Sequence, residues 1–200
     1  MKRQVWVIHG GDTYDTYDDY LAALRGWTVS LEDLKQTSWK STLGERLGTD
    51  WDVLAPRMPN SHNAKYLEWK VWFEKYVPLM AEPVILIGHS LGGTFLAKYL
   101  AETAFPHHLQ ATLLLAPPFQ APPGESLADF TLPASLETFA KQGGQIHLYH
   151  SEDDPVVPFG DLAKYKEALP TATVRTFTNR NHFNQPELPE LVADIKALES

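Results

Sequence analysis

Cysteine is absent from the chain, and its absence excludes several kinds of chemistry. There can be no disulfide framework, no cysteine nucleophile and no thiolate metal site. The sequence also lacks any apolar run approaching the roughly 18 residues that indicate a membrane-spanning helix. The start, MKRQVWVIHG, places four apolar residues after its basic ones, which is too short for a signal-peptide core. We therefore expect a cytoplasmic protein that does not enter a membrane.

Positive charge is scarce as well. The chain has 17 Lys and Arg residues against 25 Asp and Glu residues, which gives a formal net charge of -8. An acidic surface repels nucleic acid and anionic lipid, so we expect neither as a partner. The 200 residues are 44% hydrophobic and 21% charged, as in an ordinary globular protein. Length and composition together predict one domain over residues 1–200.

Six short apolar runs alternate with segments of helical character. The runs at 84–87 and 112–115 are apolar almost throughout, which is typical of strands covered on both faces in a parallel sheet. Between the strands, apolar residues recur near helical spacing, for example Leu67, Val71 and Trp72. This alternation predicts an α/β fold, with a sheet between two layers of helices. The predicted strands are 5–8, 51–54, 84–87, 112–115, 146–149 and 174–177, and the predicted helices are 61–76, 91–103, 132–142, 160–168 and 186–198.

The segment from Gly88 to Gly92 reads Gly-His-Ser-Leu-Gly and matches the pattern G-x-S-x-G. By composition, the pattern would occur by chance in about one such chain in 15. The context makes it specific, because a β-rich run enters the motif and a helical run leaves it. Glycine on either side of Ser90 leaves room for a tight turn that places the serine hydroxyl at a helix N-terminus. We interpret Ser90 as a nucleophile.

Chain order selects the base and the acid, because serine precedes the acid and the acid precedes histidine in this architecture. Of the eight histidines, only His182 follows both Ser90 and the acidic turn after the fifth apolar run. Asp154 is the preferred acid, since the following Pro-Val-Val-Pro segment makes its turn rigid. Asp153 remains the alternative. The acid holds the imidazole in one tautomer and stabilises its charged form.

Two backbone N–H groups are candidates for binding the negatively charged oxygen of the intermediate. The first is that of Leu91, the residue after the nucleophile. The second lies in the loop after the first strand, where Gly11 is preferred and Asp12 is the alternative. We expect His9 and His89 to brace the site through hydrogen bonds and to take no part in proton transfer.

Two connecting segments do not fit a minimal alternation of strands and helices. Residues 12–50 hold several aromatic side chains, and residues 117–135 are rich in proline. Both follow the carboxyl ends of predicted strands, where α/β proteins bind ligands. The aromatic side chains fit core packing, or else the lining of a pocket or a short lid. They are Tyr14, Tyr17, Tyr20, Trp27 and Trp39.

In its motifs the chain resembles the small serine hydrolases of the retinoblastoma-binding serine hydrolase type. The resemblance rests on His-Gly-Gly at 9–11, Met-Pro-Asn at 58–60, the motif at 88–92, Asp-Pro-Val-Val-Pro at 154–158 and Asn-His-Phe at 181–183. It implies a compact α/β-hydrolase fold with six parallel strands in the order 2-1-3-4-5-6 and no cap domain. It places nucleophile, acid and base on Ser90, Asp154 and His182. Residues 12–50 depart from the family, which usually has a shorter connection with an early tryptophan.

The predicted activity is hydrolysis of a small carboxylic ester through an acyl-enzyme, with no metal and no organic cofactor. A thioesterase, a short-peptide hydrolase or an acyltransferase would use the same residues and stays open. A protein-binding module on the same fold is a further alternative, although a complete set of three residues speaks against it. The expected partner is a small ester-type molecule, and the sequence indicates no protein partner.

Overall fold

The computed structural model describes residues 2–121 and 126–198. Its strands form one parallel sheet in the order β2-β1-β3-β4-β5-β6, which confirms the predicted sheet. The central strand β3 is buried along its whole length, as its apolar sequence predicts. The strands are β1 (Arg3–Ile8), β2 (Trp51–Leu54), β3 (Val84–His89), β4 (Leu109–Leu115), β5 (Gln145–Ser151) and β6 (Thr173–Phe177).

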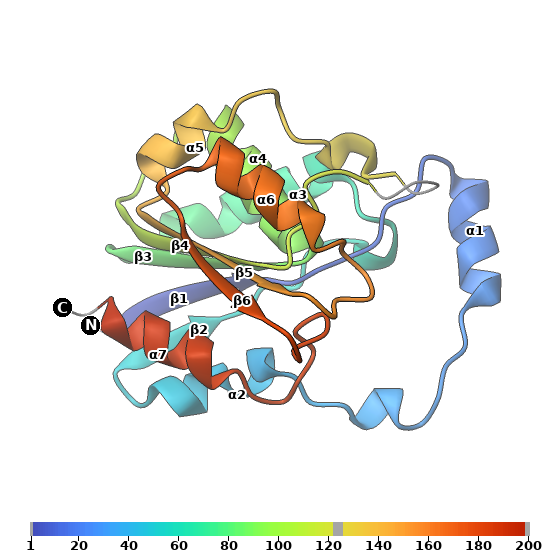
Figure 1. Cartoon of the computed structure of the whole chain (residues 1–200), viewed down its shortest axis with the longest axis horizontal. Helices are drawn as coiled ribbons and strands as arrows, with labels where there is room; N and C mark the ends of the chain where they lie inside the picture. Colours follow the sequence, from blue (N-terminus) through green and yellow to red (C-terminus); the bar gives the residue numbers. More distant parts are fainter. Residues whose placement is uncertain (1, 122–125, 199–200) are drawn as a thin grey trace.

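Helices cover both faces of the sheet (Figure 1). One layer holds α3 (Tyr66–Tyr76), α4 (Leu91–Glu102), α5 (Glu137–Gln142) and α6 (Gly160–Ala168), and the other holds α2 (Trp39–Leu47) and α7 (Pro189–Ala197). Short 3-10 turns add η1 (Asp33–Lys35), η2 (Ser61–Asn63), η3 (Val77–Leu79) and η4 (Ala128–Phe130). In the described part of the chain, no helix has the length and apolar character needed to cross a membrane.

Alternate side chains of the inner strands enter two separate cores. Trp6 and Ile8 of β1 pack into the cluster beneath α3 to α6, whereas Val5 and Val7 join the cluster beneath α2 and α7. This follows from the two-residue period of a strand, which sends neighbouring side chains to opposite faces. The sheet is therefore fixed from both sides, and the carboxyl ends of its strands hold their loops in place.

Three predicted helices begin later than expected. The segment 61–76 starts with η2, and the regular helix α3 begins only at Tyr66. Its buried face consequently carries Trp69 and Phe73, while Leu67, Val71 and Trp72 point outward and are 67%, 51% and 42% exposed. The helix predicted over 132–142 is confined to α5 at 137–142, and the helix predicted over 186–198 is α7 at 189–197, with Pro189 in its first turn.

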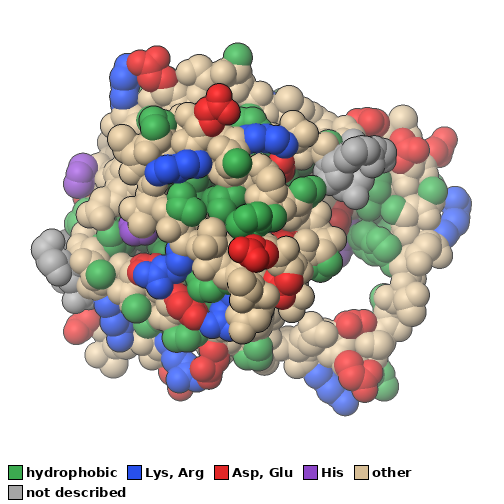
Figure 2. All heavy atoms as spheres, in the orientation of Figure 1, with side chains coloured by type: hydrophobic (Ala, Val, Ile, Leu, Met, Phe, Trp, Pro, Cys, Tyr) green, Lys and Arg blue, Asp and Glu red, His purple; other side chains and the backbone are tan. Residues whose placement is uncertain are grey.

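Residues 15–38, which we call the strap, leave the body of the molecule. The strap contains α1 (Tyr17–Gly26), which has no buried residue, and η1. Figure 1 shows α1 standing apart from both helix layers, and Figure 2 shows an opening between the strap and the body. Its large apolar side chains are exposed to solvent, namely Tyr17, Leu24, Trp27, Val29, Leu31 and Leu34. Core packing, which we expected for the aromatic residues of 12–50, is therefore observed for Trp39 and not for Tyr17 or Trp27.

The shifted buried face of α3 leads to a stability prediction. We expect Phe73→Ala to lower the free energy of unfolding by about 3–5 kcal/mol, because the ring is fully buried among aromatic neighbours. The matched control is Leu67→Ala on the same helix, which should change it by no more than about 0.5 kcal/mol. Urea denaturation of the two variants measures both values. Equal losses would contradict the observed helix orientation.

Candidate active site

Ser90 lies in the turn between β3 and α4, where the backbone is in a rare conformation. Its φ and ψ angles are 55° and -130°, a region that side chains seldom adopt. Its N–H donates to the carbonyl oxygen of Leu115 at 2.8 Å, which holds the turn against β4. The strand–turn–helix context expected for the serine motif is therefore present, and Ser90 precedes the first helical residue, Leu91.

Glycines around Ser90 permit backbone contacts that any side chain would block. A Cβ atom added to Gly88 would lie 2.5 Å from the Cα atom of Gly93. A Cβ atom added to Gly92 would lie 2.4 Å from the carbonyl oxygen of Ile8. Carbon atoms do not approach backbone so closely, so both positions require glycine for packing. These contacts bring the start of α4 directly against the ends of β3 and β1.

His182 and Asp154 are joined by hydrogen bonds. Nδ1–H of His182 donates to the Asp154 carboxylate, at 2.9 Å from Oδ2 and 3.1 Å from Oδ1. Asp154 Oδ1 also accepts the backbone N–H groups of Val156 and Val157, at 2.8 and 3.0 Å. In a neutral imidazole with its proton on Nδ1, Nε2 is an acceptor and can act as a base.

The neighbouring carboxylate has a different position. Asp153 Oδ1 accepts the Ser151 hydroxyl and, at 3.0 Å, the backbone N–H of Asn181. The Ser151 oxygen in turn accepts the N–H of Arg180 at 3.0 Å. Of the two aspartates that the sequence left open, Asp154 is the one that meets the imidazole. Asp153 ties the loop that carries His182 to the end of β5.

Three further side chains support the site, two at the His182 loop and one at the Asp154 turn, and sequence reasoning found only one of them. His89 Nε2–H donates to the His182 carbonyl oxygen at 2.7 Å, which confirms the bracing expected of His89. Trp39 Nε1–H donates to the Phe183 carbonyl oxygen at 2.8 Å. His150 Nε2–H donates to the Val157 carbonyl oxygen at 3.1 Å, and the same nitrogen lies 3.8 Å from Asp154 Oδ2. The contacts of Trp39 and His150 join distant parts of the chain or depend on loop shape, so no local pattern reveals them.

Protonation follows from these surroundings. Burial alone would raise the pKa of the Asp154 carboxyl, but the hydrogen bond from His182 and those from Val157 and Val156 lower it below its usual range. Asp154 is therefore ionised at neutral pH. Burial also lowers the pKa of four histidines, which are consequently neutral in the folded protein: His9, His89, His147 and His150.

The two backbone donors predicted to bind a negative oxygen are available. Leu91 is the first residue of α4, so its N–H has no acceptor within the helix. The N–H of Asp12 donates to the Ser61 carbonyl oxygen at 2.8 Å, and this leaves Gly11 as the better of the two candidates. His9 accepts the Met58 N–H at Nε2 and donates from Nδ1 to Gly10, which confirms its bracing role.

The serine and the two candidate backbone donors meet at a cleft of about 800 Å³. Ser90, Leu91 and Gly11 line it, together with Val156 and Val157 from the Asp154 turn. The strap contributes Asp19 and Ala22 to the lining, and the proline-rich segment contributes Pro118. Residues 122–125 of that segment lie outside the described part of the chain. Tyr14 also lines the cleft, as the pocket reading of the aromatic residues anticipated.

Within the described residues, the Ser90 hydroxyl makes no hydrogen bond to His182. The rings of His182 and His89 lie 4.9 Å apart between centroids, so the imidazole sits beside the residue that precedes Ser90. Catalytic hydrogen bonds are often long in unliganded enzymes and shorten when substrate binds. In the same part of the chain, no group of three His, Asp or Glu side chains is arranged to hold a metal ion.

Comparison with known proteins agrees with this geometry. The family model "Serine hydrolase" matches residues 22–187. The chain belongs to the serine hydrolase family. A curated member, serine hydrolase RBBP9 of Rattus norvegicus, is 28% identical over 152 residues, which cover 74% of this chain and 78% of the rat protein. The resemblance inferred from the sequence motifs is thereby confirmed, and this serine hydrolase is an enzyme.

Solved structures confirm the α/β-hydrolase fold of this serine hydrolase. The ydeN gene product of B. subtilis superimposes with a TM-score of 0.79 at 20% identity and covers 99% of both chains. The esterase domain of a Rhodothermus marinus protein gives a TM-score of 0.60 at 15% identity and covers 96% of this chain and 82% of the domain.

The neutral histidines give a prediction for the serine hydrolase in acid. An unfolded histidine takes up a proton near pH 6.5, whereas these four resist protonation in the folded state. The unfolded state then binds more protons, so the free energy of unfolding should fall as pH decreases from about 6.5 to 5.

Urea denaturation at a series of pH values measures this slope. The variant His147→Phe removes one titrating ring and should make the slope shallower, by up to about 1.4 kcal/mol per pH unit. His147 suits the test because its Nε2 is buried without a hydrogen-bond partner and its ring stacks on Tyr149. An identical slope in the variant would show that His147 titrates normally in the folded protein.

Proposed function

We propose that the protein hydrolyses small carboxylic esters through an acyl-enzyme, with Ser90 as nucleophile, His182 as base and Asp154 as orienting acid. The observation that carries the proposal is the hydrogen bond from His182 Nδ1–H to Asp154. It presents an unprotonated Nε2 beside the turn that carries a strained serine. The preferred substrate class is an ester because an alcohol is a better leaving group than an amine, and because a similar solved structure is described as an esterase domain.

The proposed reaction has two halves. Ser90 Oγ attacks the ester carbonyl carbon while His182 Nε2 takes the hydroxyl proton, and the tetrahedral intermediate collapses as the alcohol leaves with that proton. Water then attacks the acyl-enzyme, again with His182 as base, and release of the carboxylic acid restores the Ser90 hydroxyl. Asp154 stays ionised throughout and stabilises the imidazolium, consistent with the lowered pKa of its carboxyl.

Stabilisation of the intermediate is assigned to two N–H groups. Both Gly11 and Leu91 line the cleft beside Ser90, where a carbonyl oxygen would gain negative charge. The positive end of the α4 dipole adds to this field, because Leu91 opens the helix. The proposed partner is thus a small ester that fits an open cleft. The cytoplasmic location expected from the sequence stays a prediction.

The first test compares the hydrolysis of 4-nitrophenyl butyrate by purified variants. We expect Ser90→Ala to lower kcat/KM at least about 10³-fold, because the acyl-enzyme cannot form. Asp154→Asn should lower it about 10³–10⁴-fold, because the amide no longer holds the imidazole in the required tautomer. Full activity in Ser90→Ala would end the proposal.

The adjacent carboxylate supplies the matched control. Asp153→Asn keeps an oxygen that accepts from Ser151 and Asn181, so the loop should keep its shape. We expect less than about a tenfold loss of kcat/KM, since Asp153 does not contact His182. A loss of kcat/KM as large as that caused by Asp154→Asn would show that the acid role has been assigned to the wrong aspartate. Matched thioester and amide substrates then separate the ester hydrolase from its alternatives.

A further inference from the structure

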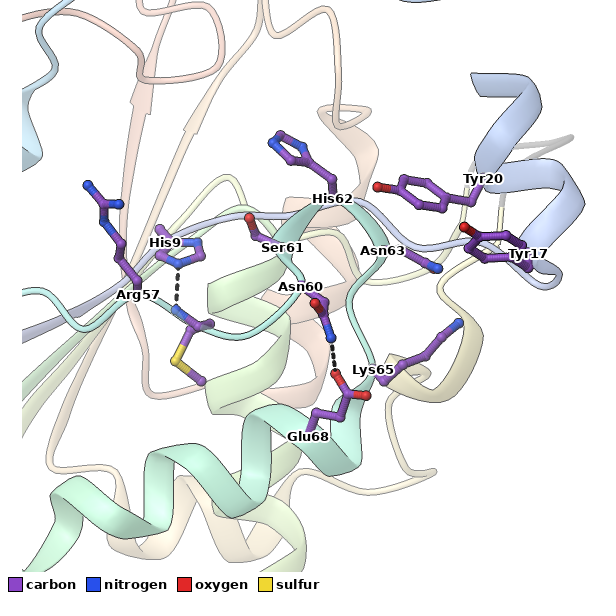
Figure 3. Close-up of a pocket in the computed structure, with 11 residues that line it drawn as sticks. His9, Tyr17, Tyr20, Arg57, Asn60, Ser61, His62, Asn63, Lys65 and Glu68 are labelled. Carbon is purple, nitrogen blue, oxygen red and sulfur yellow. Dashed lines mark hydrogen bonds between the residues drawn. The ribbon is translucent and has the colours of Figure 1, made fainter. Parts of the chain in front are cut away.

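A second cavity, of about 840 Å³, lies beside the cleft. Its walls come from His9, from the turn at 57–65 and from α1 (Figure 3). Figure 3 shows Arg57 and His9 at one end and Tyr17 and Tyr20 at the other, with His62 between them. No residue that lines this cavity also lines the Ser90 cleft. The two are separate binding spaces, and we call this one the second pocket.

Basic side chains dominate the charge of the second pocket, although the chain as a whole is acidic. Arg57 is exposed, and its guanidinium has no hydrogen bond or ion pair with any described residue. Lys65 uses one of its three N–H groups on the Tyr14 carbonyl oxygen, at 3.0 Å. The carboxylate in the lining, Glu68, already accepts from Asn60 at 2.8 Å. The donors left over therefore favour a negatively charged ligand.

The second pocket also has an uncharged polar atom without a hydrogen-bond partner and two aromatic rings. The oxygen Oδ1 of Asn63 is buried and has no hydrogen-bond partner in the described structure. A buried acceptor without a partner is costly, because it has given up its hydrogen bonds to water. Tyr17 and Tyr20 offer aromatic faces, with ring centroids 5.9 Å apart. Such faces pack well against a flat ring.

We propose that the second pocket binds an organic anion that carries a flat ring. The guanidinium of Arg57 has the planar donor geometry that matches a carboxylate or phosphate group. The tyrosines of α1 lie at the opposite end of the second pocket from Arg57, so a ligand that reaches both bridges the strap and the body of the protein. The strap makes few contacts of its own, and the Trp27 ring against His62 is one of them. A bound anion consequently fixes α1 in place.

A hydrogen bond joins the lining of the second pocket to that of the cleft. Ser61 lines the second pocket, and its carbonyl oxygen accepts the N–H of Asp12, which lines the cleft. A Cβ atom added to Gly11 would lie 2.6 Å from the same oxygen. A single hydrogen bond therefore connects the turn that lines the second pocket to the loop that carries Gly11.

Phenylphosphonate is a suitable probe, because it joins a ring to a stable anion. Isothermal titration calorimetry should detect binding to the unmodified protein, with weaker binding of methylphosphonate, which lacks the ring. Arg57→Ala should weaken phenylphosphonate binding about tenfold or more, as expected for lost hydrogen bonds to a charged group. Tyr20→Ala should weaken it while leaving methylphosphonate binding unchanged.

Two controls separate this site from the Ser90 cleft and from general charge effects. Lys141→Ala removes an exposed cation on α5, paired with Glu137, and should leave binding unchanged. Protein whose Ser90 is blocked by a fluorophosphonate should bind phenylphosphonate as tightly as before. Loss of binding in the blocked protein would move the anion to the cleft and overturn the proposal. Absence of binding to unmodified protein, or equal binding by Arg57→Ala, would also overturn it, whatever the outcome of the esterase tests.

Discussion

The close approach of backbone around Ser90 is the constraint on which the rest of the structure depends. The start of α4 touches the ends of β3 and β1 through Gly88 and Gly92, with no room for a single carbon atom. A Cβ atom added to Gly10 would likewise lie 2.9 Å from that of Ser90. This packing, together with the hydrogen bond from Ser90 N–H to Leu115, holds Ser90 at a φ angle of 55° and puts the first N–H of α4 beside it. Strain at one residue is thus maintained by contacts of three elements.

Loops at the carboxyl ends of the strands complete the site, and each is held by a different set of bonds. The turn after β5 fixes Asp154 through two backbone N–H groups, and His150 supports it from the strand. The loop after β6 carries His182 and is held by His89 and Trp39, which come from other parts of the fold. Positions so fixed keep the imidazole oriented before a substrate arrives, which lowers the cost of reorganisation during the reaction.

The sequence predicted those features that local patterns determine. The Ser90 motif lies between a buried strand and a helix, and chain order alone separated His182 from seven other histidines. The sequence did not predict contacts that form only in the folded protein, such as those from Trp39 to the His182 loop and from His150 to the Asp154 turn. The outward face of α3 was misread because both faces of the helix carry apolar side chains at helical spacing: Trp69 and Phe73 are buried, whereas Leu67 and Trp72 face solvent. The sequence marked residues 12–50 as longer than a minimal fold needs, but apolar side chains such as Tyr17 and Trp27 gave no sign that the strap stays outside both cores.

A crystal structure of the protein after reaction with a fluorophosphonate is the most direct test of the role proposed for the Ser90 turn. We expect a covalent bond from Ser90 Oγ to phosphorus, because Ser90 is the proposed nucleophile and lines the cleft. We also expect the phosphoryl oxygen to accept hydrogen bonds from the N–H groups of Gly11 and Leu91, which line the same cleft. An adduct on another residue, or a phosphoryl oxygen turned away from both N–H groups, would contradict the proposed role.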